Sequence, residues 1–288
     1  MEVPPLLNEF NPRRILVHDR SWENNVFNYV SSHQKADGGY TFVQRNEANA
    51  QDTYYGLAIL RLLDLSFPNL GKTIEWLHRF ELGKIYSYYY VGKALSLYGE
   101  SLDDRFKEYV ASAIASRKLF SSRDTYTEVA SEFQFTQMIL ELANLSGVNS
   151  TRNNDAPWLL EYKNSDGGFG VHGHSDVSLT YYAIASLDLL GFDVKSLQDS
   201  AAFLRTCEKP YGGFTVVPYS LAPYVEYTYY GVNALDALGE HCGFPSQTAD
   251  FILRCQNMNG GFARTDLGIS TFENTFQAVS VMQKLTSP

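Results

Sequence analysis

A phrase of two glycines followed by an aromatic residue recurs along the chain and constrains its fold more than any other feature. It occurs as GGY at Gly38 and as GGF at Gly167, Gly212 and Gly260. The last three copies lie about 45 residues apart, and the first gap is about three times that interval. Two degenerate units fit into the first gap. The sequence therefore predicts six repeats of one structural unit.

Each unit contains two helical patterns. The first precedes the glycines, as in 200–208, where Phe203, Leu204 and Cys207 follow helical spacing. We expect the glycine pair to end this helix, because glycine readily adopts the left-handed conformation of a helix C-terminus. The second pattern follows a loop and is apolar nearly all round, as in 227–238. It therefore predicts a buried helix.

Six helix pairs form either an open solenoid or a closed ring. An open array needs polar ends, whereas the last unit ends in the apolar segment FQAVSVMQKL. We therefore predict an all-α (α/α)6 toroid, one domain over 1–288, with the second helices inside. Their N-termini would gather at one mouth and favour an anion or a developing negative charge. The expected repeats span 16–65, 70–99, 103–147, 154–191, 194–239 and 244–285.

Composition disfavours several classes of function. The formal net charge of −9 provides no basic footprint for nucleic acid or anionic lipid, and its ordinary consequence is solubility. No apolar run reaches the length of a transmembrane helix, and the N-terminal segment lacks the apolar core of a signal peptide. Cys207, Cys242 and Cys255 lack CxxC spacing and are typical of reduced, buried thiols. We expect a cytoplasmic protein with no nucleic-acid partner and no integral membrane segment.

Two pairs of segments in the later repeats resemble the repeats of protein prenyltransferase β subunits. They are FLRTCEKPYGGFTVVP with YTYYGVNAL, and FILRCQNMNGGFARTDLG with FENTFQAVSVM. The resemblance extends from Trp22 to Leu285 and is weakest in the second and third units. That family belongs with the squalene and terpene cyclases among the α/α toroids. The resemblance implies an isoprenoid in an aromatic cavity, a zinc ion that activates a Cys thiol, basic residues that hold a diphosphate, and an α-subunit partner.

The residues that match the zinc ligands of that family differ in chemistry here. Tyr224 stands at the Asp position, Glu226 at the Cys position and Glu273 at the His position, and the loop TVVPYSLAP contains no cation for a diphosphate. Tyr227 matches a diphosphate-contacting Tyr of the family. His174 falls near a diphosphate-binding His, in a loop shortened by about three residues. We expect no zinc site, and a divalent metal stays open.

Glu226 and Glu273 are the leading catalytic candidates, because they open adjacent second helices in the same register. We predict that both carboxylates point into one space at the mouth, where two neighbouring acids raise one pKa and retain a proton. The alternative is that a helix N-terminus merely favours Glu, Gln or Ser, since Gln51 and Ser178 occupy the same column. Asp52 is a third candidate acid, or else a capping residue.

Tyrosines near the start of the second helices are candidate substrate-binding residues. They would contact an isoprenoid or steady a carbocation, or they simply form core. The candidates, with His174, are Tyr54, Tyr88, Tyr181, Tyr224, Tyr227 and Tyr229. The segment GVHGHSD alternates His172, His174 and Asp176, which suits an exposed loop, a metal contact or a phosphate contact.

Three functions stay open. The first is an isoprenoid-handling enzyme similar to a prenyltransferase β subunit but without zinc-dependent S-prenyl transfer. The second is a terpenoid cyclase or isomerase with a carboxylic acid at the mouth, although the Asp-x-Asp-Asp motif of class II cyclases is absent from the sequence. The third is a non-catalytic toroid that binds a lipid or a protein partner. The fate of a polyprenyl diphosphate separates these three.

Overall fold

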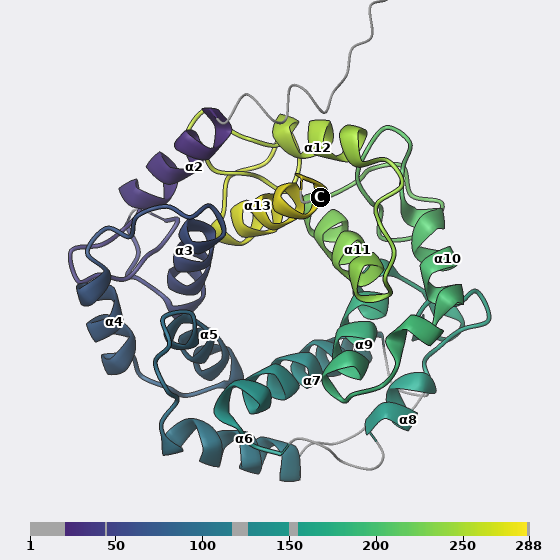
Figure 1. Ribbon diagram of the computed structural model, residues 1–288, viewed down its shortest axis with the longest axis horizontal. Coiled ribbons are helices and arrows are strands. Elements are labelled where there is room, and N and C mark those ends of the chain that lie inside the picture. Colours follow the sequence, from purple (N-terminus) through teal and green to yellow (C-terminus); the bar gives the residue numbers. More distant parts are fainter. Residues whose placement is uncertain (1–20, 44, 117–125, 150–154, 287–288) are drawn as a thin grey trace, which may run out of the picture.

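The computed structural model describes residues 21–43, 45–116, 126–149 and 155–286. The N-terminal segment discussed above lies outside the described residues. Within them, twelve α-helices alternate between two concentric layers (Figure 1). The inner layer is α3 (Ala50–Leu62), α5 (Ile85–Ser96), α7 (Tyr126–Ser146), α9 (Val177–Leu189), α11 (Val225–Ala237) and α13 (Phe272–Thr286). The outer layer is α2 (Ser21–Ser32), α4 (Leu70–Arg79), α6 (Asp104–Ser116), α8 (Asp155–Leu160), α10 (Gln198–Cys207) and α12 (Pro245–Arg254).

The inner helices close into a ring. Each contacts the next one along the chain, and α13 contacts α3. The predicted all-α toroid is therefore confirmed, whereas the predicted repeat bounds stay predictions. Strands are minor in the described residues: β1 (Gly170–Val171) pairs with β2 (His174–Ser175) in an antiparallel hairpin. No helix of the described part combines the length and apolar character that a membrane crossing requires.

The two layers differ in burial because their surroundings differ. The inner helix α3 is buried from Ala50 to Leu60 except at Gln51, since it has neighbours on both sides and an outer helix behind it. The outer helix α4 buries only Thr73 and Leu77, which lie one turn apart on a single stripe. Burial of nearly every residue of α3 explains why this second helix reads as apolar nearly all round.

The glycine pairs do not end the outer helices, so that prediction was wrong. The helix α2 already ends at Ser32, and the glycines lie in a turn whose flanking residues, Gln34 and Tyr40, form an antiparallel bridge. The first glycine of each pair has a positive φ, between 89° and 105°. A Cβ on Gly212 would lie 2.1 Å from the backbone oxygen of Gln247, at the N-terminus of the next outer helix. Glycine is therefore required both by backbone conformation and by close approach between repeats.

One threonine in each of four inner helices anchors this turn. The Thr228 hydroxyl accepts a hydrogen bond from the Phe214 backbone N–H at 3.0 Å and donates to the Tyr224 carbonyl at 2.8 Å. The bond from the Phe214 N–H is buried, so this donor would have no water to replace the Thr228 hydroxyl. The same pair of bonds occurs at Thr53, Thr180 and Thr275. This column fixes each glycine turn onto the first turn of its own inner helix.

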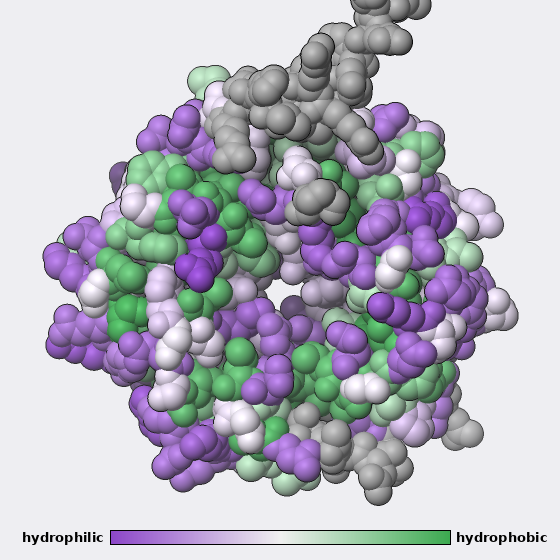
Figure 2. All heavy atoms as spheres, viewed as in Figure 1, coloured by the Kyte–Doolittle hydropathy of each residue, from purple (hydrophilic) through white to green (hydrophobic). Residues whose placement is uncertain are grey.

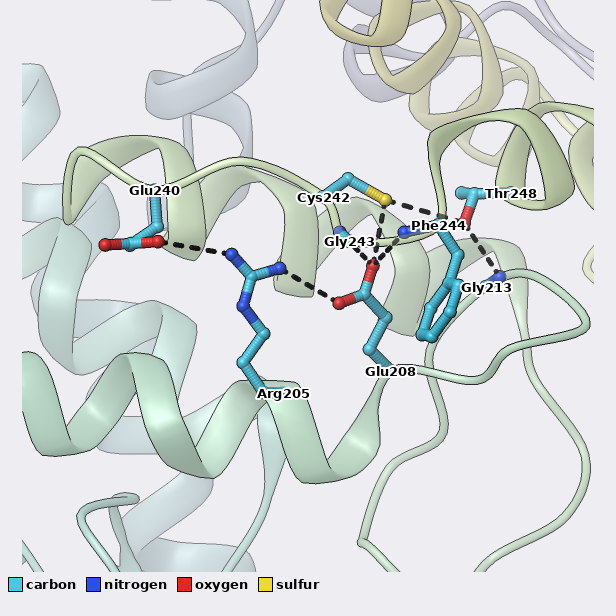
Figure 3. Close-up of polar contacts among 8 residues, drawn as sticks. All are labelled: Arg205, Glu208, Gly213, Glu240, Cys242, Gly243, Phe244 and Thr248. Carbon is cyan, nitrogen blue, oxygen red and sulfur yellow. Dashed lines mark hydrogen bonds and ion pairs between the residues drawn. The ribbon is translucent and has the colours of Figure 1, made fainter.

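Polar contacts hold the outer helix of the fifth repeat against the segment that leads into the outer helix of the sixth (Figure 3). The Glu208 side chain is 1% exposed and accepts hydrogen bonds from the backbone N–H groups of Gly243 and Phe244 at 2.6 and 3.1 Å. It also pairs with Arg205 at 3.0 Å and accepts from the Cys242 thiol. At the matching position of the last repeat, Gln256 donates to the Trp22 carbonyl at 3.0 Å. The outer layer therefore also closes between the last repeat and the first.

Candidate functional site

The inner helices surround a central cavity of about 420 Å³. The space-filling view shows that the ring is hollowed at its centre (Figure 2). The lining includes Tyr55 and Glu273 near the N-terminal ends of α3 and α13, and Leu189 and Ala237 at the C-terminal ends of α9 and α11. The cavity therefore extends along the axis of the ring, from the N-terminal part of some inner helices to the C-terminal end of others.

Aromatic rings form much of the cavity wall. The ring of Tyr181 stacks on that of Tyr230 at 4.9 Å between centroids, and Phe276 lies 5.1 Å from Tyr55. Burial raises the pKa of Tyr229 to about 12, so its phenol is neutral at physiological pH. The predicted lining residues Tyr54, Tyr181 and Tyr229 all line the cavity, together with Tyr55, Tyr89, Tyr90, Tyr182, Tyr230 and Phe276. This surface can contact an apolar chain and a cation by the faces of its rings.

Tyr88 lies elsewhere, contrary to its predicted place in the cavity. Its ring stacks on that of Tyr109, in the outer helix α6, at 3.9 Å with an interplanar angle of 11°. Successive side chains on a helix point about 100° apart, so Tyr88 faces the outer layer when its two successors, Tyr89 and Tyr90, face the cavity.

Glu273 lies at the mouth, in the first turn of α13. Its carboxylate accepts hydrogen bonds from the Tyr55 phenol at 3.4 Å and from the Gln51 amide at 3.5 Å. Burial raises the pKa of Glu273, and the negative charges of Glu226 and Asp52 raise it further, against the opposing effect of Tyr55. Glu273 therefore keeps its proton to a higher pH than an exposed glutamate does.

Glu226 has a different environment because a cation accompanies it. The helix α11 begins at Val225, earlier than predicted, which places Glu226 in the first turn. Arg264 lies 2.6 Å from Oε1 of Glu226, 3.4 Å from the Tyr227 hydroxyl and 4.2 Å from the centre of the Tyr224 ring. Arg264 was not predicted, since it precedes the next inner helix and reaches back to this one. At the mouth, the Glu226 carboxylate is thus paired with a cation, whereas the Glu273 carboxylate has neutral hydrogen-bond partners.

These mouth residues do not fit a zinc ion. The Arg264 guanidinium already neutralises Glu226 and covers the Tyr224 ring, and a second cation there would be repelled. Among the described residues, no three or more His, Cys, Asp and Glu side chains are arranged to hold a metal ion. All three cysteines are free. Whether the protein binds a divalent metal elsewhere stays open.

Glu226, Tyr224 and Tyr227 are not part of the cavity lining, and two further candidates, Asp52 and His174, also lie outside it. Asp52 is buried, and its Oδ2 accepts hydrogen bonds from the Phe42 backbone N–H at 3.1 Å and from the Asn49 amide at 2.8 Å. The geometry therefore makes Asp52 an anchor for the loop before α3. His174 is exposed in β2, where it pairs with Val171. Neither contributes to the cavity wall.

An ion pair inside the cavity was not anticipated from the sequence. Nζ of Lys93, in α5, lies 2.6 Å from Oε1 of Glu141, in α7, and both residues line the cavity. The only local signal is that Lys93 lies one turn beyond Tyr89 in the tyrosine stripe of α5. Its partner comes from a different repeat, so a single-helix pattern could not reveal the pair.

A toroid of paired helices with glycine turns and an aromatic central cavity points to one class of protein. The chain matches the prenyltransferase alpha-alpha toroid domain family over residues 13–81, 78–245 and 244–287, and it belongs to that family. No curated protein matches the sequence.

Solved structures share the fold at low sequence identity. Candida albicans protein geranylgeranyltransferase-I, complexed with GGPP, superimposes with a TM-score of 0.70 at 14% identity, over 90% of each chain. A type II terpene cyclase from Scytonema, in complex with geranylgeranyl dihydroxybenzoate, gives a TM-score of 0.59 at 14% identity over 97% of this chain and 98% of the cyclase. The same cyclase with the product merosterolic acid A gives 0.60 at 14% identity, over 96% and 98%. At this identity the likeness concerns the fold alone.

Proposed function

We propose that this protein is an isoprenoid-handling enzyme that binds the chain of its substrate in the central cavity. The observation that carries the proposal is the set of tyrosine rings around that cavity, joined by Phe276. Ring faces provide apolar contact for a prenyl chain and electrostatic attraction for a developing carbocation. The cavity volume of about 420 Å³ falls within the range of small-molecule sites.

The ligands of the solved neighbours support an isoprenoid. The transferase was determined with GGPP and the cyclase with geranylgeranyl dihydroxybenzoate. Zinc-dependent S-prenyl transfer is not proposed, because Arg264 occupies the cation position beside Glu226 at the mouth. An α-subunit-like partner and a cytoplasmic location stay predictions.

A second candidate function is cyclisation or isomerisation started by Glu273 as a general acid. The observation that favours it is the burial of this carboxyl beside the aromatic wall, which raises its pKa. Phe276 lies on the same helix, one turn further into the cavity. A cation formed near Glu273 would therefore meet ring faces at once.

The test combines binding and product analysis. The purified protein is incubated with geranylgeranyl diphosphate or geranylgeraniol, retained ligand is measured by native mass spectrometry, and products are identified by gas chromatography with mass spectrometry. Glu273→Gln should retain ligand but lose about 100-fold or more of any turnover. Glu240→Gln, in a half-exposed outer-layer ion pair, is the matched control and should change neither.

The outcomes separate the candidates. A cyclised product that depends on Glu273 supports the acid role, and turnover that survives Glu273→Gln removes it. Retained but unchanged lipid in every variant points to a non-catalytic toroid. If the protein retains neither ligand, the isoprenoid proposal itself is refuted.

A further inference from the structure

Lys93 and Glu141 form an ion pair in the cavity wall. Contact between the tyrosine rings and a prenyl chain does not require this pair, and neither does proton transfer from Glu273. The Lys93 and Glu141 side chains are 19% and 24% exposed. The residue one turn earlier on each helix completes the group: Lys93 donates to the Tyr89 phenol at 3.2 Å, and Gln137 donates to Oε2 of Glu141 at 2.7 Å. The Tyr89 phenol also donates across to Oε2 of Glu141 at 2.5 Å. We call these four residues the polar wall.

A buried ion pair is a costly way to join two helices. Desolvation of both charges offsets much of their attraction, and apolar side chains of similar volume often pack at least as well. Burial opposes ionisation of both groups here. The surrounding phenols and Glu141 nevertheless raise the pKa of Lys93, and Lys93 lowers the pKa of Glu141, so the pair stays ionised. A charged pair retained in an aromatic cavity is typical of a functional site.

The polar wall can exchange hydrogen bonds with a ligand in the cavity. An ammonium group has three N–H donors: two are directed to Glu141 and Tyr89, and the Tyr54 phenol, which also lines the cavity, is a third partner of Lys93. Oε1 of Glu141 accepts from Lys93, and the other donors of the polar wall reach Oε2, so Oε1 can accept a further hydrogen bond. The wall therefore offers this acceptor beside an ammonium group whose third N–H a ligand can share with Tyr54, with a net charge of zero.

We infer that the polar wall binds the hydroxyl or phenol group of an oxygenated isoprenoid. This inference rests on the proposed function and names its substrate class. A hydroxyl donates and accepts at once, so it can satisfy Lys93 and Glu141 together. A diphosphate gains no net charge attraction from a neutral pair, and a hydrocarbon leaves both capacities unfilled. The chain of the ligand would then lie against Tyr181 and Tyr229, which line the same cavity.

The position of Lys93 fits a ligand whose polar group lies deep in the ring. Nζ lies 5.0 Å from the centres of both the Tyr54 and Tyr89 rings, so aromatic faces flank the ammonium group. Lys93 comes two turns after the start of α5, whereas Glu273 lies in the first turn of α13. The two polar features of the cavity are therefore separated along its axis, and the apolar chain would occupy the length between them.

The experiment compares two ligands on two proteins. Geranylgeraniol and the same C20 chain ending in a methyl group are titrated, with native mass spectrometry or tyrosine fluorescence as the readout. The variant Lys93→Met/Glu141→Leu replaces the pair by apolar side chains. The wild-type protein should prefer the alcohol, and the variant should lose about 10-fold to 100-fold of that preference, as expected for hydrogen bonds to charged groups. Because both proteins see the same two ligands, differences in aqueous solubility cancel.

The control variant is Lys284→Met/Asp236→Leu, which removes an exposed ion pair between the neighbouring inner helices α11 and α13. It should keep the full preference for the alcohol. An equal preference in wild-type and Lys93→Met/Glu141→Leu proteins, with both ligands bound, overturns the inference and leaves the proposed function standing. Tighter binding of geranylgeranyl diphosphate that depends on Lys93 also overturns it. If the wild-type protein binds none of these ligands, the proposed function fails first.

Discussion

Closure of the ring predicts that Gly260 tolerates no side chain. This glycine lies in the turn before α13 and has a φ of +90°. A Cβ at this position would lie 2.0 Å from the backbone oxygen of Asn25, in the outer helix of the first repeat. Gly260→Ala therefore tests the junction between the last repeat and the first.

The expected loss follows from two separable terms. A non-glycine residue held in a sparsely populated backbone region costs about 1–3 kcal/mol. Forcing a methyl group into a packed junction costs about another 1–3 kcal/mol, because a backbone oxygen cannot rotate away as a side chain can. The sum is about 2–6 kcal/mol, which corresponds to a fall in melting temperature of roughly 5–20 °C for a large domain.

The measurement is thermal and urea unfolding followed by circular dichroism at 222 nm. The matched control is Gly71→Ala in α4, where a Cβ would have no atom within 4 Å. The same chemical change should stabilise there, by up to about 1 kcal/mol, because alanine favours a helix. If Gly260→Ala unfolds within 1 kcal/mol of the wild-type protein, the junction at Asn25 does not hold the ring closed.

Two further predictions concern carboxylates with unlike surroundings. Glu208→Ala should lower the free energy of unfolding by about 2–6 kcal/mol, since it leaves two backbone N–H groups without their acceptor and Arg205 with Glu240 alone. Glu240→Ala, half exposed, should cost under about 1 kcal/mol in the same urea titration. Glu273 has a raised pKa in the folded state, so its contribution to stability is fully present below its ordinary value of 4.5 and is lost as the pH rises through the folded value. Glu273→Gln should therefore gain stability relative to wild type between pH 4 and pH 8, by about 1.4 kcal/mol per unit by which the pKa is raised, and a stability difference that does not rise with pH contradicts this.

The sequence was sufficient to predict the ring because its signals are local and repeated. Periodicity within each helix indicated which helices are buried, and the apolar final segment indicated closure. Register along the inner helices also placed Glu226 and Glu273 in one first-turn column, and the structure brings them near enough to influence the pKa of Glu273. The direction of each side chain around its helix was harder to predict, as Tyr88 shows, because a stripe of consecutive tyrosines has no polar face to orient it.

Contacts between repeats could not be predicted from one sequence. The glycine pair was interpreted as a helix cap because a positive φ is common there. Its actual cause is the backbone of the following repeat, which lies 2.1 Å from the Cβ that Gly212 lacks. Lys93 with Glu141, and Arg264 with Glu226, likewise pair across neighbouring repeats. Each member of these pairs reads as an ordinary charge on its own helix.

The two columns at the start of the inner helices explain which positions are free to vary in chemistry. Thr53, Thr180, Thr228 and Thr275 each satisfy one buried N–H of the glycine turn, so any apolar replacement would leave that donor unpaired. The residues two positions earlier do not have to accept this hydrogen bond. They are Gln51, Ser178, Glu226 and Glu273.

At the mouth this freedom gives two glutamates different surroundings. Arg264 pairs with Glu226, whereas the hydrogen-bond partners of Glu273 are neutral and burial raises the pKa of its carboxyl group. Two like groups in unlike environments can take different roles in one reaction. In the proposed function Glu273 is the group that gives up a proton, and Glu226 with Arg264 forms an ion pair beside it.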